Sequence, residues 1–292
     1  MWPRSTGSPP ARPPGAGPAY APFDAVLCDL DNVIRFYDMA GVTELERAAG
    51  LAAGTTTKVA YAPEVDLPLL LGRITPDEWV EAITRGLMDL PAGRRAHGRG
   101  TGEPVTGEPM TDGPVTDGPV TDGPVTDDGP AGAGGAGAGS PGPDAWAREL
   151  GRALARAPFR ADPAVVSLLR RARARVPLVL VTNASLQLDY DLASLGLTDL
   201  ADAIVSSAAE GVAKPDRAIY EIAAARAGVP MERCLFVDDR QENIAAAVAL
   251  GMTGVLFREP ADLERALGPV LDGSPREAAH GDTAEEDTWV AR

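Results

Sequence analysis

The feature that most constrains the fold is a regular alternation of short apolar runs and helical segments. The runs are four to six residues long, and two of the helical segments end in glycine, at Gly196 and Gly251. Short connections between alternating strands and helices predict parallel strands with helices on both faces. The expected elements are strands 24–29, 177–182, 203–206, 234–238 and 254–257 and helices 186–195, 216–227 and 241–250. The chain is therefore predicted to be an α/β protein with a doubly wound, parallel, Rossmann-like sheet.

A second, helical part of the protein is predicted inside this alternation. The first strand ends near residue 29 and the next begins near residue 177, so a long segment is inserted after the first strand. Within it, helix 76–88 begins with a capping box formed by Thr75 and Glu78. Its apolar stripe, which we expect to form a core, consists of Trp79, Ile83 and Leu87. Further helical segments are expected at 42–53, 63–72, 144–156 and 163–174.

The low-complexity stretches set the predicted domain organisation. Residues 109–130 repeat Gly-Pro-Val-Thr-Asp with a period of five residues. A repeat with proline and glycine in every unit forms neither a helix nor a solenoid, so a flexible insert is expected. The predicted parts are a disordered arm at 1–22, a Rossmann-like core at 23–35 and 157–271, a small helical domain at 36–97 and 144–156, the low-complexity insert at 98–143, and an acidic disordered tail at 272–292.

Charge and hydropathy argue against nucleic acids and membranes as partners. The net charge is −15, of which residues 101–130 carry −7 and residues 272–292 carry −4. The acidity is therefore concentrated in the predicted disordered segments, and it argues against nucleic-acid binding. The sequence contains no apolar run long enough to span a membrane and no apolar signal segment at its start, so no membrane association is expected.

Cysteine and histidine usage narrows the chemistry further. The two cysteines, Cys28 and Cys234, lie in apolar runs, which is typical of core residues in a reducing cytoplasm. The two histidines, His97 and His280, lie in polar stretches outside the predicted strands and helices. This placement argues against a Ser-His triad and against a histidine metal site.

Polar side chains gather where the predicted strands end, which is the edge where an open parallel sheet binds ligands. They are Asp29, Asp31, Thr182, Asn183, Asp238 and Asp239, with Lys214 in the loop before helix 216–227. Several carboxylates at one edge repel one another unless a cation joins them. Oxygen ligands without histidine or cysteine favour Mg²⁺ over zinc or copper. The sequence therefore predicts a magnesium site at this edge of the sheet.

Four short motifs at these strand ends resemble, in order, those of the haloacid dehalogenase superfamily. They are Asp29-x-Asp31-x-Val33, Val-Thr182-Asn183, Val-Ala-Lys214-Pro215-Asp and Phe-Val-Asp238-Asp239-Arg-x-x-Asn. One departure is Asn32, where the family usually has glycine; asparagine tolerates a left-handed backbone better than most residues do. The resemblance covers residues 23–95 and 144–268. It implies that the helical domain is a cap that closes over the site, excludes water and favours small substrates.

The resemblance also implies a catalytic role for each of these residues. Asp29 would attack phosphorus to form an aspartyl-phosphate, and Asp31 would protonate the leaving alkoxide and then take a proton from water. Thr182 and the backbone amide of Asn183 would hold phosphoryl oxygens. Lys214 would neutralise the nucleophile and the phosphate together. The implied activity is hydrolysis of a small phosphorylated metabolite.

The same resemblance implies the metal ligands. Mg²⁺ would be held by Asp29, by the backbone carbonyl of Asp31 and directly by Asp239, with Asp238 acting through water. The cation and Lys214 would cancel the repulsion between a carboxylate and a phosphate dianion, which is about 4 kcal/mol per charge pair at ~4 Å and an effective dielectric of ~20. Mg²⁺ is the one cofactor predicted.

Other functions stay open or are disfavoured. A sugar-phosphate mutase uses the same four motifs but requires a bisphosphate activator, and a non-catalytic interaction protein would use the repeat and the acidic tail to bind partners that the sequence does not identify. A haloacid dehalogenase would lack the second acid, Asp31. A phosphonatase would need a Schiff-base lysine, for which Lys58 is the candidate. Cys234 and Arg240 have the spacing of a cysteine phosphatase loop, but a buried strand and two acids lie between them.

Overall fold

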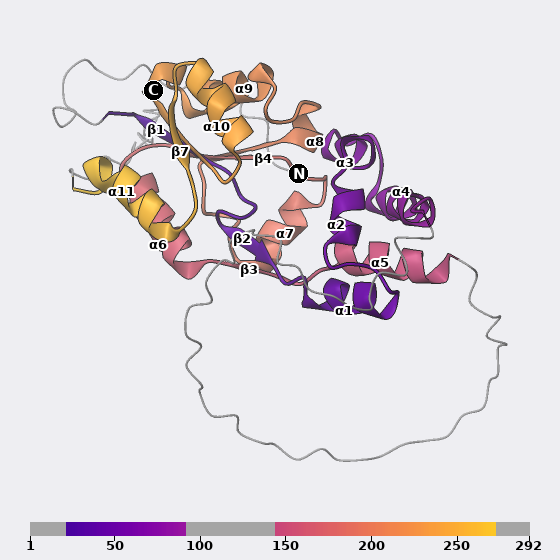
Figure 1. The fold of residues 1–292 in the computed structure, drawn as a ribbon. Coiled ribbons are helices and arrows are strands. Elements are labelled where there is room, and N and C mark those ends of the chain that lie inside the picture. Colours follow the sequence, from indigo (N-terminus) through magenta and orange to yellow (C-terminus); the bar gives the residue numbers. More distant parts are fainter. Residues whose placement is uncertain (1–21, 92–143, 273–292) are drawn as a thin grey trace, which may run out of the picture.

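The computed structural model describes residues 22–91 and 144–272 and has a five-stranded parallel sheet at its centre (Figure 1). The strand order is β5-β4-β1-β6-β7. The bounds are β1 Ala25–Cys28, β4 Leu178–Thr182, β5 Ala203–Ser206, β6 Cys234–Asp238 and β7 Thr253–Leu256. Because the order runs outward from β1 in both directions, the predicted doubly wound sheet is confirmed. The central strand β1 is flanked by β4 and β6, which places the ends of these three strands side by side.

Helices cover both faces of the sheet because successive strand side chains point to opposite sides. Val26 and Cys28 belong to one core, and Ala25 and Leu27 belong to the other. The first core is shared with α6 (Pro163–Arg173), α7 (Leu188–Ser194) and α11 (Pro260–Leu271). The second core is shared with α9 (Arg217–Ala227) and α10 (Gln241–Ala249).

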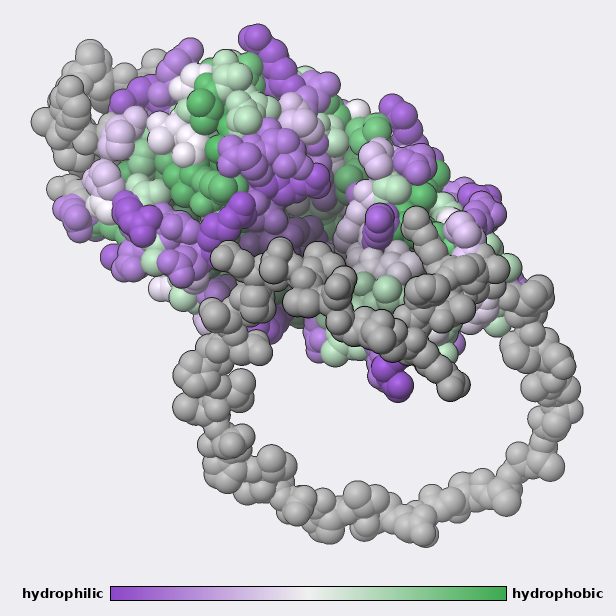
Figure 2. Space-filling view, in the orientation of Figure 1, coloured by the Kyte–Doolittle hydropathy of each residue, from purple (hydrophilic) through white to green (hydrophobic). Residues whose placement is uncertain are grey.

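A separate group of helices packs around a third core beside the sheet (Figure 1), and Figure 2 shows the surface of both parts in the same orientation. The helices are α1 (Ala40–Ala48), α2 (Thr55–Ala60), α3 (Pro63–Leu70), α4 (Pro76–Met88) and α5 (Ala145–Ala155). The capping box predicted for α4 is present, with the Glu78 amide donating to the Thr75 hydroxyl at 3.2 Å and the Thr75 amide donating to the Glu78 carboxylate at 2.7 Å. Trp79, Ile83 and Leu87 are buried in this third core, as predicted.

The structure differs from the predicted elements in several places, and the helices α8 (Ser207–Glu210) and α11 were not predicted. The helix expected at 42–53 ends at Ala48 and is followed by the separate helix α2, because Gly50 and Gly54 adopt positive φ angles of 70° and 81° that end a right-handed helix. A small antiparallel sheet, formed by β2 (Arg35–Tyr37) and β3 (Phe159–Ala161), was not predicted. Its strands are three residues long, and such short strands have no detectable periodicity.

Other parts of the sequence analysis fall outside the described residues. The predicted arm and tail lie there except for their boundary residues 22 and 272, and the whole low-complexity insert lies there. Within the described ranges, none of the helices combines the length and the apolar character that crossing a membrane requires.

A glycine sets the approach of the helical group to the sheet domain. Gly72 follows α3 with a φ of 66°, and a Cβ atom added to it would lie 2.8 Å from the carbonyl oxygen of Ala208 in α8 (Ser207–Glu210). A side chain at Gly72 would therefore both strain the backbone and push the two elements apart.

Gly72→Ala is expected to destabilise the protein by about 2 kcal/mol, because it combines a positive φ with a clash against backbone. Gly41→Ala in α1 is the matched control, since an added Cβ there has no atom within 4 Å and alanine favours a helix. Denaturant unfolding of both variants measures the difference. Equal stabilities for the two variants would contradict the close α3–α8 approach.

Candidate active site

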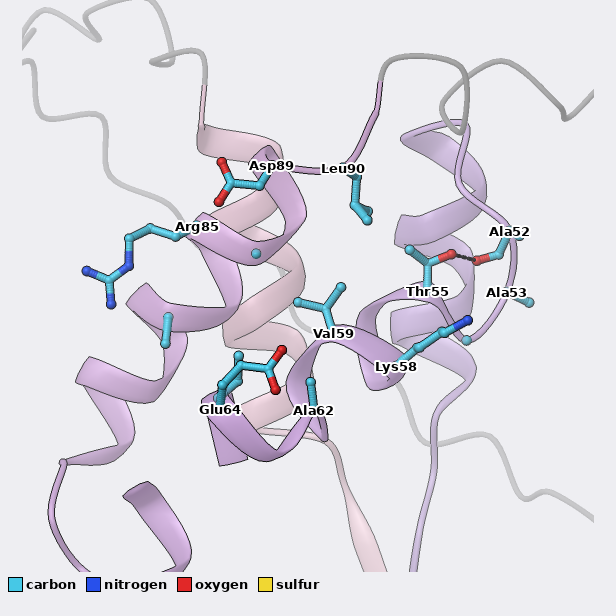
Figure 3. Close-up of a pocket in the computed structure, with 14 residues that line it drawn as sticks. Ala52, Ala53, Thr55, Lys58, Val59, Ala62, Glu64, Arg85, Asp89 and Leu90 are labelled. Carbon is cyan, nitrogen blue, oxygen red and sulfur yellow. Dashed lines mark hydrogen bonds between the residues drawn. The ribbon is translucent and has the colours of Figure 1, made fainter. Parts of the chain in front are cut away.

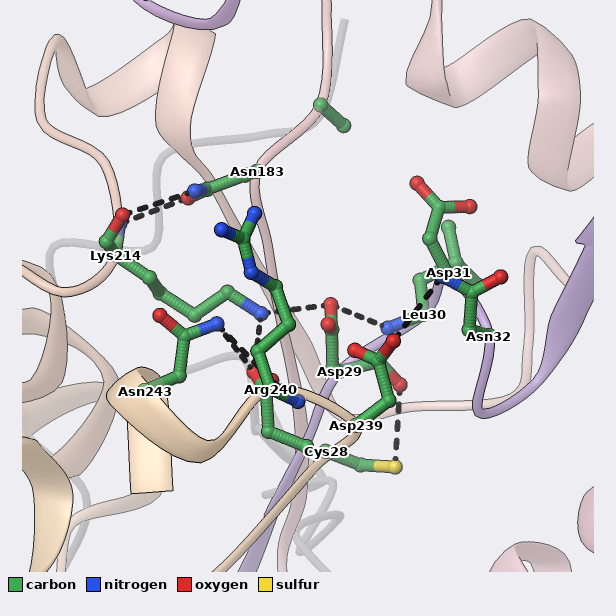
Figure 4. A network of polar contacts seen from close by, with 12 residues as sticks. Cys28, Asp29, Leu30, Asp31, Asn32, Asn183, Lys214, Asp239, Arg240 and Asn243 are labelled. Atoms are coloured by element: carbon green, nitrogen blue, oxygen red, sulfur yellow. Dashed lines mark hydrogen bonds and ion pairs between the residues drawn. The ribbon is translucent and has the colours of Figure 1, made fainter. Parts of the chain in front are cut away.

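The ends of three neighbouring strands bring most of the predicted site residues together (Figure 4). Asp29 follows β1, Thr182 is the last residue of β4, and Asp238 is the last residue of β6. Lys214 comes from the loop between α8 and α9 and reaches the same place. The strand order therefore assembles residues that are up to 209 positions apart in the sequence, counted from Asp29 to Asp238.

Lys214 lies between two carboxylates. Its Nζ is 2.7 Å from Oδ1 of Asp29 and 2.7 Å from Oδ2 of Asp238, and its side chain is 1% exposed. The ring of Phe236 lies 5.9 Å from the same nitrogen. A buried ammonium group at these distances is held by charge-assisted hydrogen bonds to both acids. The predicted contact between Lys214 and Asp29 is thus present, and the contact with Asp238 was not predicted.

The charges of Lys214, Asp29 and Asp238 shift one another's pKa values in the direction opposite to the effect of burial. Burial raises the pKa of Asp29, and the neighbouring Lys214 ammonium lowers it without cancelling the rise. Burial lowers the pKa of Lys214, but Asp29 and Asp238 together outweigh that effect and raise it above its usual value. The two acids therefore favour the charged form of Lys214.

Asp238 is held by hydrogen bonds at both of its oxygens. Oδ1 accepts from the Arg240 backbone amide at 2.8 Å and from the Asn243 side chain at 3.0 Å. Oδ2 accepts from Lys214 and, at 3.1 Å, from the same Asn243 nitrogen. Asp238 is completely buried. Its oxygens are thus engaged with protein donors, whereas Asp239 next to it is only half-buried.

Three carboxylates form a candidate metal centre. Among the residues that the structure describes, Asp29, Asp238 and Asp239 each offer an oxygen, and these atoms lie within 4.8 Å of one another. Burial and the neighbouring Asp238 raise the pKa of Asp239, while the Asn32 amide, which donates to it at 3.1 Å, lowers it. Asn32 has a φ of 58°, which agrees with the left-handed backbone expected at this position. Clustered oxygen ligands of this kind suit a hard divalent cation.

Thr182 and Asn183 lie at the end of β4. The Asn183 side chain accepts from the Lys214 amide at 2.8 Å and donates to the Lys214 carbonyl at 3.0 Å, so it fastens the lysine loop to the strand end. The Thr182 hydroxyl is buried and has no hydrogen-bond partner among the residues that the structure describes. An unpaired buried hydroxyl costs about 1–3 kcal/mol, and a ligand that accepts a hydrogen bond from it would recover that energy.

Asp31 is the predicted site residue whose side chain lies apart from this group. Figure 4 shows its carboxylate turned away from Lys214. Both of its oxygens accept hydrogen bonds from Arg35, at 2.6 and 3.0 Å. The backbone places Asp31 beside the site, but its carboxylate is not among the three that could share a metal ion.

Three further residues were missed in the sequence analysis. Asn243 was part of the last motif, five residues after Asp238, but no role was assigned to it. Arg35 and Asp191 form an ion pair at 2.7 Å across 156 residues of sequence. No local pattern signals this contact, since Arg35 lies in a three-residue strand and Asp191 lies on a helix surface.

The structure also shows the surroundings of the cysteines and of Lys58, on which the alternative chemistries depend. Cys28 and Cys234 are buried free thiols, and burial raises the pKa of both, which opposes a reactive thiolate. Lys58 is exposed and lines a pocket of about 1030 Å³ between α2, α3 and α4 (Figure 3). None of the predicted site residues lines this pocket.

The helical group faces the site through α3. Asp66 in this helix is close enough to Arg240, the residue after Asp239, for the guanidinium to lower its pKa. Burial has the larger, opposite effect and raises the pKa of Asp66 to about 6. The folded protein therefore binds this proton more tightly than the unfolded chain does, so ionisation of Asp66 costs stability as the pH rises from about 4 to about 6.

Asp66→Asn is expected to stabilise the protein by about 1 kcal/mol at pH 7.5 and to have little effect at pH 4, because the amide never ionises. Thermal unfolding at the two pH values measures the difference between variant and wild type. Glu64→Gln, an exposed position on the same helix, is the control. A gain that is equal at both pH values would show that ionisation of Asp66 is not its cause.

Comparison with known proteins shows that most of the chain matches the model of one protein family. A family model described as haloacid dehalogenase-like hydrolase matches residues 23–251. The chain is 36% identical over 99 residues to the sesquiterpene phosphatase astK of Aspergillus oryzae, covering 33% of this chain and 50% of that protein. It is 32% identical over 123 residues to the phosphatase MT3486 of Mycobacterium tuberculosis, covering 39% of this chain and 55% of that protein. The matches therefore span about half the length of these two relatives.

Solved structures with a similar arrangement were also found. The HAD family enzyme bt-2542 of Bacteroides thetaiotaomicron is 15% identical, with a TM-score of 0.49, over 80% of this chain and 93% of that one. An L-2-haloacid dehalogenase of Xanthobacter autotrophicus is 19% identical, with a TM-score of 0.47, over 85% of this chain and 84% of that one.

Proposed function

Because the chain belongs to the haloacid dehalogenase-like hydrolase family, we propose that it is a Mg²⁺-dependent phosphatase. It would hydrolyse a small phosphomonoester through an aspartyl-phosphate on Asp29. The observation that carries the proposal is the contact of 2.7 Å between Asp29 and Lys214, inside a group of three carboxylates. Two relatives that carry the name phosphatase support it.

The charge of the site fits a divalent cation. Three carboxylates and one ammonium group leave two negative charges uncompensated. Asp29 and Asp239 would be direct ligands, with the backbone carbonyl of Asp31, while Asp238, whose oxygens already accept hydrogen bonds, would act through water. When bound, Mg²⁺ supplies charge neutralisation and polarises the phosphoryl oxygens.

The first half of the proposed reaction transfers the phosphoryl group to Asp29. One oxygen of this carboxylate attacks phosphorus in line with the ester oxygen, so a new P–O bond to Asp29 forms as the bond to the alcohol breaks. Asp31 gives its proton to the departing alkoxide. Lys214 and the Thr182 hydroxyl bind phosphoryl oxygens, which stabilises the charge that develops on them.

The second half returns the enzyme to its starting state. Asp31, now a carboxylate, takes a proton from a water molecule as the water oxygen attacks phosphorus. The bond between phosphorus and Asp29 breaks, and inorganic phosphate leaves. Asn183 and Asn243 contribute indirectly, because they hold the Lys214 loop and the Asp238 carboxylate in place.

Asp29→Asn is expected to lower the turnover of phosphomonoesters by a factor on the order of 10³ or more, because an amide is a poor nucleophile. Phosphate release from a substrate panel, with and without Mg²⁺, measures it. Asp24→Asn, at the other end of the same strand and paired with Arg233 at the surface, is the matched control and is expected to keep full activity. Turnover that persists in Asp29→Asn would remove this mechanism.

Exposed apolar side chains near the site favour a substrate whose alcohol is apolar. Tyr37 packs on the Arg35 guanidinium, with the ring centre 5.1 Å away, and is 37% exposed. Tyr61 is 55% exposed, and its pKa is raised to about 12 by partial burial and by nearby Asp31.

Three more exposed apolar residues adjoin site segments. Leu186 follows Asn183 by three residues, Tyr190 precedes Asp191, and Leu67 follows Asp66. Each is more than 40% exposed. Exposed apolar side chains beside a site are available to contact a ligand. We propose that they contact the apolar alcohol part of the substrate, a class to which a phosphorylated sesquiterpene, named for one relative, also belongs.

Leu186→Ser and Tyr190→Ser are expected to lower kcat/KM for a prenyl or aromatic phosphomonoester about tenfold, because apolar contact area is lost. Their kcat/KM for glycerol phosphate is expected to change little. Val248→Ser is the control, since Val248 is 51% exposed near the C-terminal end of α10, five residues beyond Asn243. Equal effects on both substrates would reject an apolar alcohol while leaving the phosphatase proposal in place.

A further inference from the structure

Arg35 holds the Asp31 carboxylate in one orientation. Its Nε donates to Oδ1 at 2.6 Å and its Nη2 donates to Oδ2 at 3.0 Å, so both carboxylate oxygens are occupied. The Arg35 side chain is 3% exposed, and the rings of Tyr37 and Phe159 lie 5.1 and 5.3 Å from its guanidinium. A fork of this kind fixes a carboxylate in direction as well as in position. Asp31 must therefore leave Arg35 before its carboxyl group can reach a leaving group.

A second carboxylate shares the same guanidinium. Nη1 of Arg35 donates to Oδ2 of Asp191 in α7 at 2.7 Å. The buried Arg35 guanidinium thus contacts two carboxylates, although one carboxylate is enough to neutralise its charge. When Asp31 turns away, the pair of Arg35 and Asp191 stays neutral. Without Asp191 the same movement would leave a buried cation unpaired, which is strongly unfavourable.

We propose that Arg35 and Asp191 are positioning residues for the proton transfer by Asp31. Arg35 holds Asp31 in its withdrawn orientation, and Asp191 keeps Arg35 paired while Asp31 turns toward the substrate. Once it has left Arg35, the Asp31 carboxylate takes up a proton from solvent, and in the turned orientation this proton passes to the ester oxygen as the P–O bond breaks and the bond between Asp29 and phosphorus forms. This inference rests on the proposed function, because it assigns residues to a step of that reaction.

The test uses two substrates that differ in their need for a proton. An alkyl phosphate must have its leaving alkoxide protonated, whereas 2,4-dinitrophenyl phosphate releases a stable phenolate without a proton. The parameter kcat/KM covers the steps up to formation of the aspartyl-phosphate, so the later role of Asp31 as a base does not enter it. Asp31→Asn removes the acid and sets the size of the full effect.

Asp191→Asn is the informative variant, because replacement of Arg35 would leave two acids without their cation and endanger folding. Its kcat/KM is expected to fall about tenfold or more for the alkyl phosphate and less than about threefold for the dinitrophenyl ester. The activity on the dinitrophenyl ester also reports that the variant is folded. Asp189→Asn, exposed on the same helix, is the matched control and is expected to match the wild type on both esters.

Two results would overturn the inference and leave the phosphatase proposal intact. The first is an equal loss of kcat/KM on both esters in Asp191→Asn, which would indicate a structural role alone. The second is a kcat/KM of Asp191→Asn that equals the wild-type value on both esters. If Asp31→Asn itself does not discriminate between the esters, Asp31 is not the acid. In that case the proposed mechanism and this inference fail together.

Discussion

The candidate site is organised around one buried ammonium group. Lys214 touches Asp29 and Asp238 at 2.7 Å each, and its side chain is 1% exposed. Removal of the ammonium group would leave two buried carboxylates without their cation, at a cost of about 3–5 kcal/mol. The two acids therefore depend on Lys214, and the contact requires that β1 lie beside β6 and that the loop before α9 reach both strand ends. Asn183 binds the lysine loop and Asn243 binds Asp238, so both partners of the contact are held at the strand ends.

The sequence was sufficient to predict those parts of the site that follow from the order of the strands alone. The carboxyl ends of parallel strands meet at one edge, so Asp29, Thr182 and Asp238 were expected together once their strands had been identified. All five strands of the central sheet were predicted within two residues of their observed bounds. The helix α4 was also predicted at both ends, because its capping box and apolar stripe are local signals.

Contacts that depend on packing between distant segments could not be predicted. The sheet of β2 and β3 joins strands more than 120 residues apart, and each strand is too short to have a pattern. The carboxylate of Asp31 was expected in the site, yet it binds Arg35, and that contact depends on the β2–β3 sheet and on α7. The division between α1 and α2 arises from backbone angles at two glycines, which sequence shows only as permitted conformations.

Two buried cations in this protein follow the same electrostatic plan with different chemistry. Lys214 is shared by Asp29 and Asp238, and Arg35 is shared by Asp31 and Asp191. In each case one acid is proposed to take part directly in the reaction, and the other is not. Under the proposed mechanism the second acid would keep the cation paired when Asp29 is phosphorylated or when Asp31 rotates.

The choice of cation suits the two tasks. A compact ammonium group can touch a carboxylate and a phosphoryl oxygen at once, as the proposed role of Lys214 requires, whereas a planar guanidinium grips one carboxylate through two parallel hydrogen bonds, as Arg35 does with Asp31. Arginine in place of Lys214 would put a planar group where one charge has to be shared between two partners. Lysine in place of Arg35 would lose the paired hydrogen bonds that hold the Asp31 carboxylate in one orientation. The electrostatic plan of the site thus depends on the shape of each cation as well as on its charge.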